Sequence, residues 1–87
     1  GEKTGGIAMK KYEIKATGQV LTLTIKIWSK AGKNRLYLNL TGGYGDFAYV
    51  ENGVIVGTTK DWEKMERKCP EMAQQIKAAI AAYEEEL

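Results

Sequence analysis

The chain has no histidine, one cysteine and one proline, and each shortage excludes a class of protein. Without histidine there is no imidazole base, and one thiol, Cys69, makes neither an internal disulfide nor an ordinary zinc site. No run of about 18 apolar residues is available to span a bilayer as a helix. We therefore expect a cytoplasmic protein that does not enter membranes, with no metal and no other cofactor.

Catalysis has little support in the residues that are present. Ser29 is the only serine, and no base stands in a pattern that would activate it. Cys69 falls on an apolar helical stripe, which predicts a buried, inert thiol, although a place just before Pro70 at a new helix start would favour a reactive one. We expect no enzymatic activity and no catalytic residues.

The composition is that of an ordinary soluble globular protein. The 87 residues are 44% hydrophobic and 28% charged, which predicts one folded domain over residues 9–87. Gly1–Ala8 contains three glycines and no periodicity, so it is interpreted as a flexible leader or an expression remnant. Residues 1–60 carry nine basic and four acidic side chains, whereas residues 61–87 carry four and seven. The sheet region is thus basic and the helical region acidic.

Strict alternation over residues 20–41 predicts a long hairpin with one apolar face. The apolar side comprises Leu21, Leu23, Ile25, Ile27, Leu36, Leu38 and Leu40, and the opposite side comprises Thr22, Thr24, Lys26, Trp28, Arg35, Tyr37 and Asn39. A further strand is expected at 10–17, and a short hairpin at 47–50 and 54–56 is expected around Asn52-Gly53, a pair that tolerates positive φ.

Apolar residues then recur at helical spacing from Trp62 to Leu87, through Met65, Cys69, Met72, Ile76, Ile80 and Tyr83. Thr59 or Asp61 is expected to cap this helix, Pro70 to kink or break it near 67–69, and Glu84–Glu86 to fray. The predicted fold class is α+β: a twisted antiparallel β-sheet of three long strands plus a short hairpin, packed on one face by the C-terminal helix. This element order is similar to that of small single-strand-binding modules such as the purine-rich-element binding repeats, without a shared residue motif.

The polar side of the hairpin combines aromatic and cationic residues. The candidate binding residues are Lys26, Trp28, Lys30, Lys33, Arg35 and Tyr37. Such a face suits single-stranded DNA or RNA, because bases stack on aromatic rings while lysine and arginine neutralise phosphates. It equally suits a protein partner, as in a small intracellular interaction or inhibitor protein of the mobile-element type that uses this face or a sheet edge. A plain solvated face stabilised by cross-strand pairs is the third interpretation.

Two further features bear on binding. A homodimer through a sheet edge or face is compatible with an open five-stranded sheet. The stretch Gly43–Val50, which begins in the glycine-rich segment Gly42–Asp46, superficially resembles the phosphate-covering loop of protein kinases. The chain is too short for a kinase, and no lysine followed by serine or threonine completes a P-loop. We therefore expect this segment to be a connection or bulge.

Overall fold

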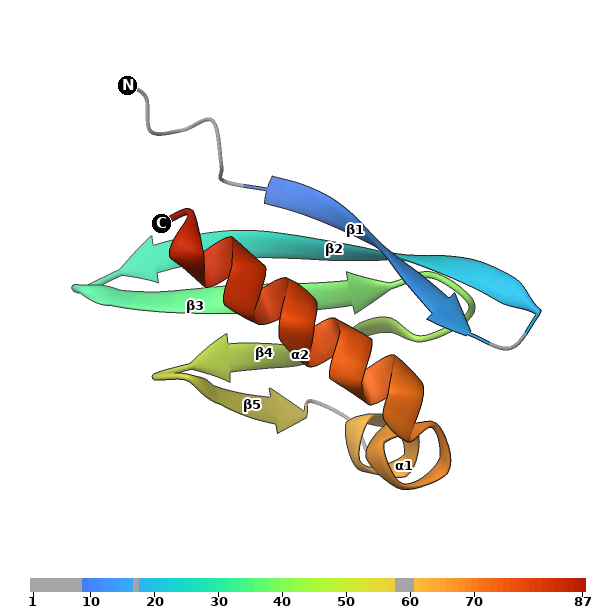
Figure 1. The fold of residues 1–87 in the computed structure, drawn as a ribbon. Coiled ribbons are helices and arrows are strands. Elements are labelled where there is room, and N and C mark those ends of the chain that lie inside the picture. The colour runs from blue at the N-terminus through green and yellow to red at the C-terminus, as the bar shows by residue number, and fades with distance from the viewer. Residues whose placement is uncertain (1–8, 17, 58–60) are drawn as a thin grey trace.

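The computed structural model describes residues 9–16, 18–57 and 61–87, apart from the side chains of Lys30 and Asp61. The expected leader at Gly1–Ala8 and the expected cap at Thr59 lie outside these residues. Five strands precede two helices (Figure 1): β1 (Met9–Ala16), β2 (Gln19–Lys30), β3 (Lys33–Leu40), β4 (Gly45–Glu51), β5 (Val54–Gly57), α1 (Asp61–Lys68) and α2 (Pro70–Glu85). The predicted α+β class is confirmed.

The strands form one antiparallel sheet in the order β1-β2-β3-β4-β5, so each strand pairs with its neighbours in the chain. The turn between β4 and β5 is the predicted one, because Asn52 and Gly53 both have positive φ, 54° and 76°. The resulting meander is elongated, since the β1–β2 hairpin extends beyond the other strands (Figure 1).

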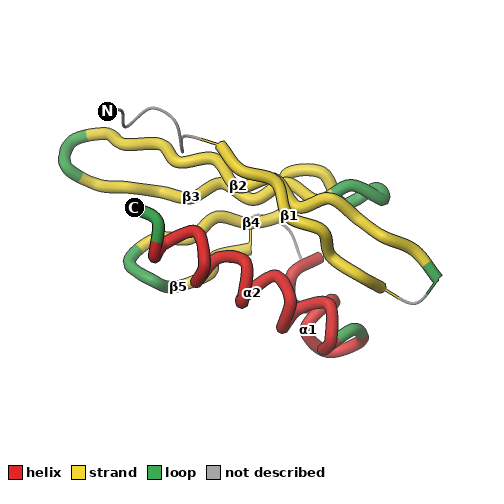
Figure 2. The backbone as a smooth tube through the Cα atoms, turned by 45° about the horizontal axis from the view of Figure 1, so that its top comes forward, coloured by secondary structure: helices red, strands yellow, loops and turns green. Residues whose placement is uncertain are grey.

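Both helices lie against one face of the sheet (Figure 2), where α2 contacts β1 and β2, and α1 contacts β4 and β5. The alternation places the predicted apolar residues in the core between these layers, as expected. The buried strand residues are Ile14, Leu21, Leu23, Ile25, Leu36, Leu38, Leu40, Phe47, Ala48 and Val50. Ile27 is partly buried and packs against this core.

The strand β4 departs from strict alternation. Its pairing with β3 shifts between Leu38 and Asn39, so that Leu38 lies opposite Ala48 while Asn39 lies opposite Asp46. Phe47 is the extra residue of this β-bulge, which allows Phe47 and Ala48 both to be buried. The strand runs from Gly45 to Glu51, longer than the four residues expected from the sequence.

The predicted break of the helix is confirmed, but the predicted burial of Cys69 is wrong. α1 ends at Lys68 and α2 begins at Pro70, where a proline needs no amide hydrogen bond. Cys69 has φ −134° and ψ 65°, outside helical geometry, so it leaves the helical stripe and is exposed. Leu87 lies beyond the end of α2 and is exposed as well, whereas the other members of the stripe are buried.

The end of α2 is held against β1, contrary to the expectation that Glu84–Glu86 fray. The helix continues to Glu85, and the carboxylate of Glu86 accepts a hydrogen bond from Lys10 Nζ at 2.5 Å. This ion pair raises the pKa of Lys10 above its ordinary value. Nearer the start of α2, the Gln75 amide accepts a hydrogen bond from Lys15 N–H and donates one to Lys15 C=O, each at 2.7 Å. Helix and edge strand are thereby joined at two places.

Candidate functional site on the outer face of the sheet

The face of the sheet that the helices leave uncovered carries the predicted polar and aromatic residues. We call this surface the outer face. The strand register arranges its central residues in two cross-strand rows, the first being Met9, Lys26, Tyr37, Tyr49 and Val56, and the second Trp28, Arg35, Glu51 and Val54. Residues directly opposite each other on neighbouring strands are close enough to interact, so each row is a potential contact surface.

Aromatic rings occupy the middle of this face. Trp28 is 58% exposed and Tyr37 is 39% exposed. The ring of Tyr37 lies 6.0 Å from the ring of Tyr49 on β4, with the two planes tilted by 45°. This spacing and tilt fall within the favourable range for aromatic pairs. Tyr37 and Tyr49 therefore form a packed pair of rings, and Trp28 is more exposed than Tyr37.

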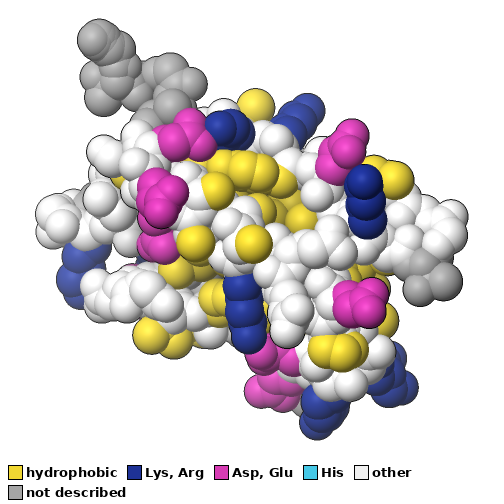
Figure 3. Space-filling view, in the orientation of Figure 1, with side chains coloured by type: hydrophobic (Ala, Val, Ile, Leu, Met, Phe, Trp, Pro, Cys, Tyr) yellow, Lys and Arg dark blue, Asp and Glu magenta, His cyan; other side chains and the backbone are white. Residues whose placement is uncertain are grey.

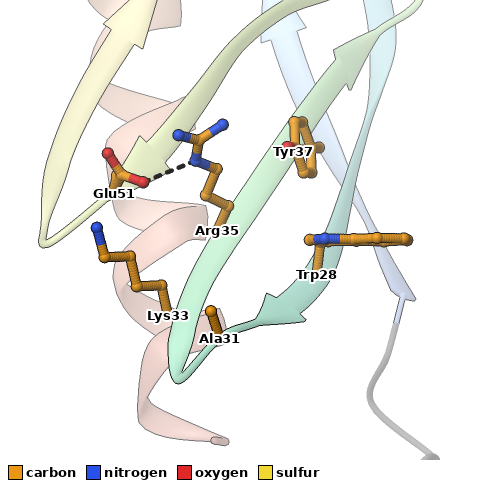
Figure 4. A pocket seen from close by; sticks show the side chains of 6 residues that line it. All are labelled: Trp28, Ala31, Lys33, Arg35, Tyr37 and Glu51. Atoms are coloured by element: carbon orange, nitrogen blue, oxygen red, sulfur yellow. Dashed lines mark hydrogen bonds and ion pairs between the residues drawn. The ribbon is translucent and has the colours of Figure 1, made fainter.

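Arg35 is held in place by three neighbours. Its Nε donates a hydrogen bond to Glu51 Oε2 at 2.7 Å, and its guanidinium lies 4.6 Å from the centre of the Tyr49 ring (Figure 4). The bond to Glu51, and next to it one with Tyr37, raises the pKa of Arg35 above its ordinary value. Arg35 is therefore oriented by its surroundings, and the charge of Glu51 balances its own.

An open hollow of about 470 Å³ lies beside this group, near the β2–β3 turn. Its lining comprises Trp28, Ala31, Lys33, Arg35, Tyr37 and Glu51 (Figure 4). In that view the Trp28 ring stands apart from the Arg35–Glu51 pair, on the other side of β3. The hollow thus offers an apolar wall, two cationic groups and one carboxylate.

The structure brings four of the six predicted site residues to one place. Trp28, Lys33, Arg35 and Tyr37 share the hollow. Lys26 is exposed and lies opposite Tyr37 on β2, outside the lining of the hollow. The backbone of Lys30 ends β2, and its side chain is outside the described part of the structure.

Sequence analysis missed the contributions of β4 and β5. Tyr49 and Glu51 contact Arg35, and Val54 and Val56 extend the apolar surface at 60% and 37% exposure. The Asn52-Gly53 turn was a usable signal, because a two-residue hairpin pairs Glu51 with Val54 and Tyr49 with Val56. Which of these residues face Arg35 depends on the bulge at Phe47, for which the sequence carries no clear signal.

The glycine-rich segment has a structural explanation. Gly42, Gly43 and Gly45 all have positive φ, and they turn the chain between β3 and β4. A Cβ atom at Gly42 would lie 2.9 Å from Leu21 Cδ2, a side chain of the buried core, so this position needs glycine for space as well. Of the two expected alternatives, a connection or a bulge, this geometry agrees with the connection.

The helix side of the molecule shows apolar side chains together with charged ones (Figure 3). Acidic and basic side chains are interspersed over it (Figure 3), including the Lys77–Glu66 ion pair at 3.1 Å between α2 and α1. Within the described residues, no cluster of histidine, cysteine and carboxylate side chains could hold a metal ion, and no helix is long and apolar enough to cross a membrane.

Comparison with known proteins gives no family and no functional relative: no protein-family model, no curated protein and no solved structure matches the chain. The outer face is therefore interpreted from its own geometry.

Proposed function

We propose that this chain is a small non-enzymatic binding module that docks a protein partner on its outer face. The proposal rests on the distribution of the exposed apolar side chains between the two sides of the molecule. Of the seven large hydrophobic residues exposed in the described structure, six lie on the outer side of the sheet: Met9, Val20, Trp28, Tyr37, Val54 and Val56. Antiparallel sheets normally present polar groups to water, and apolar patches of this kind favour protein interfaces.

The centre of the face also suits a protein partner. Tryptophan, tyrosine and arginine are the residues that most often dominate binding energy at interfaces, and here Trp28, Tyr37 and Arg35 line one hollow. Because Glu51 and Tyr49 already hold Arg35 in position, little side-chain entropy is lost when a partner binds. The balanced Arg35–Glu51 pair further favours a partner of mixed charge over a polyanion.

Single-stranded DNA or RNA is the second candidate, and a specific observation favours it. Trp28 presents more than half of its surface to solvent, and two exposed lysines, Lys26 and Lys33, lie near it on β2 and β3. A base stacked on Trp28 would have cations within reach of its phosphates. Glu51 in the same hollow opposes this mode of binding, which places it second.

The two candidates are separated by one set of variants and two probes. A random peptide display library is selected on the wild-type protein, and selected peptides are titrated against the Trp28→Ala/Tyr37→Ala double variant. Fluorescence anisotropy with labelled single-stranded DNA and RNA at about 50 and 200 mM salt tests the second candidate, since phosphate contacts weaken steeply over this range.

We expect selected peptides to lose at least about tenfold in affinity on the double variant. The matched control is Leu87→Ala, an exposed apolar residue beyond the end of α2 and outside the outer face, which should leave affinity unchanged. Peptides that bind the double variant as well as wild type would overturn the proposal. Micromolar, salt-sensitive oligonucleotide binding that is lost in the double variant would replace it with the nucleic-acid module.

A further inference from the structure

The two edge strands of the sheet differ in how well they are protected against pairing with another chain. Among the described residues β1 pairs only with β2, and β5 pairs only with β4, so each presents one row of backbone groups that no strand satisfies. Such an edge is a template for pairing with another chain unless charge, proline, a bulge or a covering side chain prevents it. Within the described residues, such protection is found only at the β1 edge.

The β1 edge is protected. Lys10, Lys11 and Lys15 place charge along it, and the side-chain amide of Gln75 takes up both outward backbone groups of Lys15. At the other end of β1, the Lys10–Glu86 ion pair fastens the strand to the end of α2. An added strand would have to displace these contacts, so pairing at β1 is disfavoured.

The β5 edge has none of this protection among its described residues. Val54, Ile55, Val56 and Gly57 include no charge and no proline, and their pairing with β4 is regular. In a two-residue hairpin the residues that flank the turn exchange hydrogen bonds, so Val54 and Val56 direct their backbone groups toward β4. Ile55 and Gly57 consequently direct their N–H and C=O groups away from the sheet.

We propose that a second copy of this chain pairs with β5 in antiparallel orientation, joining two five-stranded sheets into one sheet of ten strands. In the register that uses every outward group, Ile55 of each copy exchanges two hydrogen bonds with Gly57 of the other. The two-fold axis then passes beside Val56, and the two Val56 side chains meet on the outer face. A contact of this kind is isologous, as most homodimer contacts are.

The surroundings of β5 suit a copy of the same surface. On the helix side, β5 borders an open apolar groove of about 510 Å³ whose lining includes Ile55, Trp62 and Ile80. The rim of this groove carries Lys77 together with Glu66 and Glu84, so both signs of charge are present for contact with a second copy. Since β5 itself is uncharged, two copies approach along it without like-charge repulsion.

The dimer would place two outer faces side by side in one sheet, so a partner with two docking segments would bind more tightly than to one copy. Because a four-residue edge gives a small interface, we expect dimerisation at roughly micromolar to hundred-micromolar concentration. Docking of a single peptide on the outer face does not require the dimer, so the two proposals succeed or fail independently.

Sedimentation velocity from about 5 to 500 µM tests the dimer, a range that brackets a weak interface. We expect wild type to move from the monomer mass of 9.7 kDa to twice that mass. Val56→Lys and Val56→Glu should each stay monomeric, because like charges meet at the axis, and an equimolar mixture of the two variants should restore the dimer. Val20→Lys, the same change at a distant exposed valine, is the control and should still dimerise.

Hydrogen exchange of the wild-type protein gives a readout that needs no substitution. The amides of Ile55 and Gly57 should become more protected as concentration rises, while the β1 amides should not change. Wild type that remains monomeric over the whole range overturns the proposal. A Val56→Lys variant that dimerises like wild type places the contact elsewhere and overturns it equally.

Discussion

The two tryptophans give a direct test of which side of the sheet is exposed. Trp28 on β2 is 58% exposed, whereas Trp62 on α1 is 5% exposed, with its ring 6.1 Å from that of Phe47. Replacing a buried tryptophan with alanine costs about 3–5 kcal/mol, which is the loss expected for Trp62→Ala. Trp28→Ala removes contacts over less than half of the side chain, so its cost scales to about 1–2 kcal/mol.

Urea unfolding followed by circular dichroism measures both costs. With a slope of about 1–1.5 kcal/mol per molar urea for a protein of this size, the midpoint should fall by about 1 M for Trp28→Ala and about 3 M for Trp62→Ala. Each variant retains a single tryptophan, so fluorescence reports each site separately. Emission from Trp28 should be red-shifted and readily quenched by iodide, and emission from Trp62 should be blue-shifted and protected.

Equal costs for the two variants, or a larger cost for Trp28→Ala, would refute this reasoning. Either result would mean that the outer face is covered in the folded protein, and docking on Trp28 and Tyr37 would then be excluded. Adding Tyr37→Ala to Trp28→Ala extends the test to the second ring, and this change should leave the protein folded because Tyr37 is 39% exposed.

Three further results are expected. Gln75→Leu should lower the free energy of unfolding by about 1–2 kcal/mol in urea titration, because two hydrogen bonds to Lys15 are lost, while Gln74→Leu at an exposed position should change it little. Tyr12→Phe should cost nothing or stabilise slightly, since the Tyr12 hydroxyl is buried without a hydrogen-bond partner among the described residues; a clear loss in the same assay would contradict this. Burial raises the pKa of Tyr12 and of Tyr83 above the ordinary value of 10.0, so the unfolded chain loses these protons at a lower pH than the folded protein does. The melting temperature should therefore fall as pH rises above 10, and it should fall less steeply with pH in Tyr12→Phe. Melting temperatures that do not change between pH 9 and 11 would contradict the last expectation.

The faces of the sheet could be predicted because a strand has a period of two, which depends on local sequence alone. Leu23, Ile25 and Leu38 are buried and Trp28 is exposed, as the alternation indicates. The same local reasoning failed at Cys69. There the helical period was extended across Pro70, but the chain leaves helical geometry for one residue, and the side chain turns to solvent.

The candidate site could be predicted only in part. The residues that come from β4 were missed, because their position depends on how β4 pairs with β3. Arg35 and Trp28 were identified from β2 and β3, which a single hairpin pattern places together. Glu51 and Tyr49 come from β4, and their position opposite Arg35 and Tyr37 depends on a register that the bulge at Phe47 alters. The hairpin pattern predicts Arg35 as a phosphate-binding cation but gives no sign of Glu51, whose carboxylate pairs with it in the structure.

The meander order has a consequence for how the protein reaches its folded state. Because every strand pairs with its neighbours in the chain, the sheet can assemble hairpin by hairpin, and each step closes only a short loop. Proteins dominated by such local contacts fold quickly for their size. The contacts that hold α2 against β1 close much longer loops, 60 residues between Lys15 and Gln75 and 76 between Lys10 and Glu86. We therefore expect docking of α2 on β1 to limit the folding rate. Before α2 docks, the partly folded sheet would expose its apolar face to solvent. Whether it aggregates in a crowded solution would then depend on how fast α2 docks.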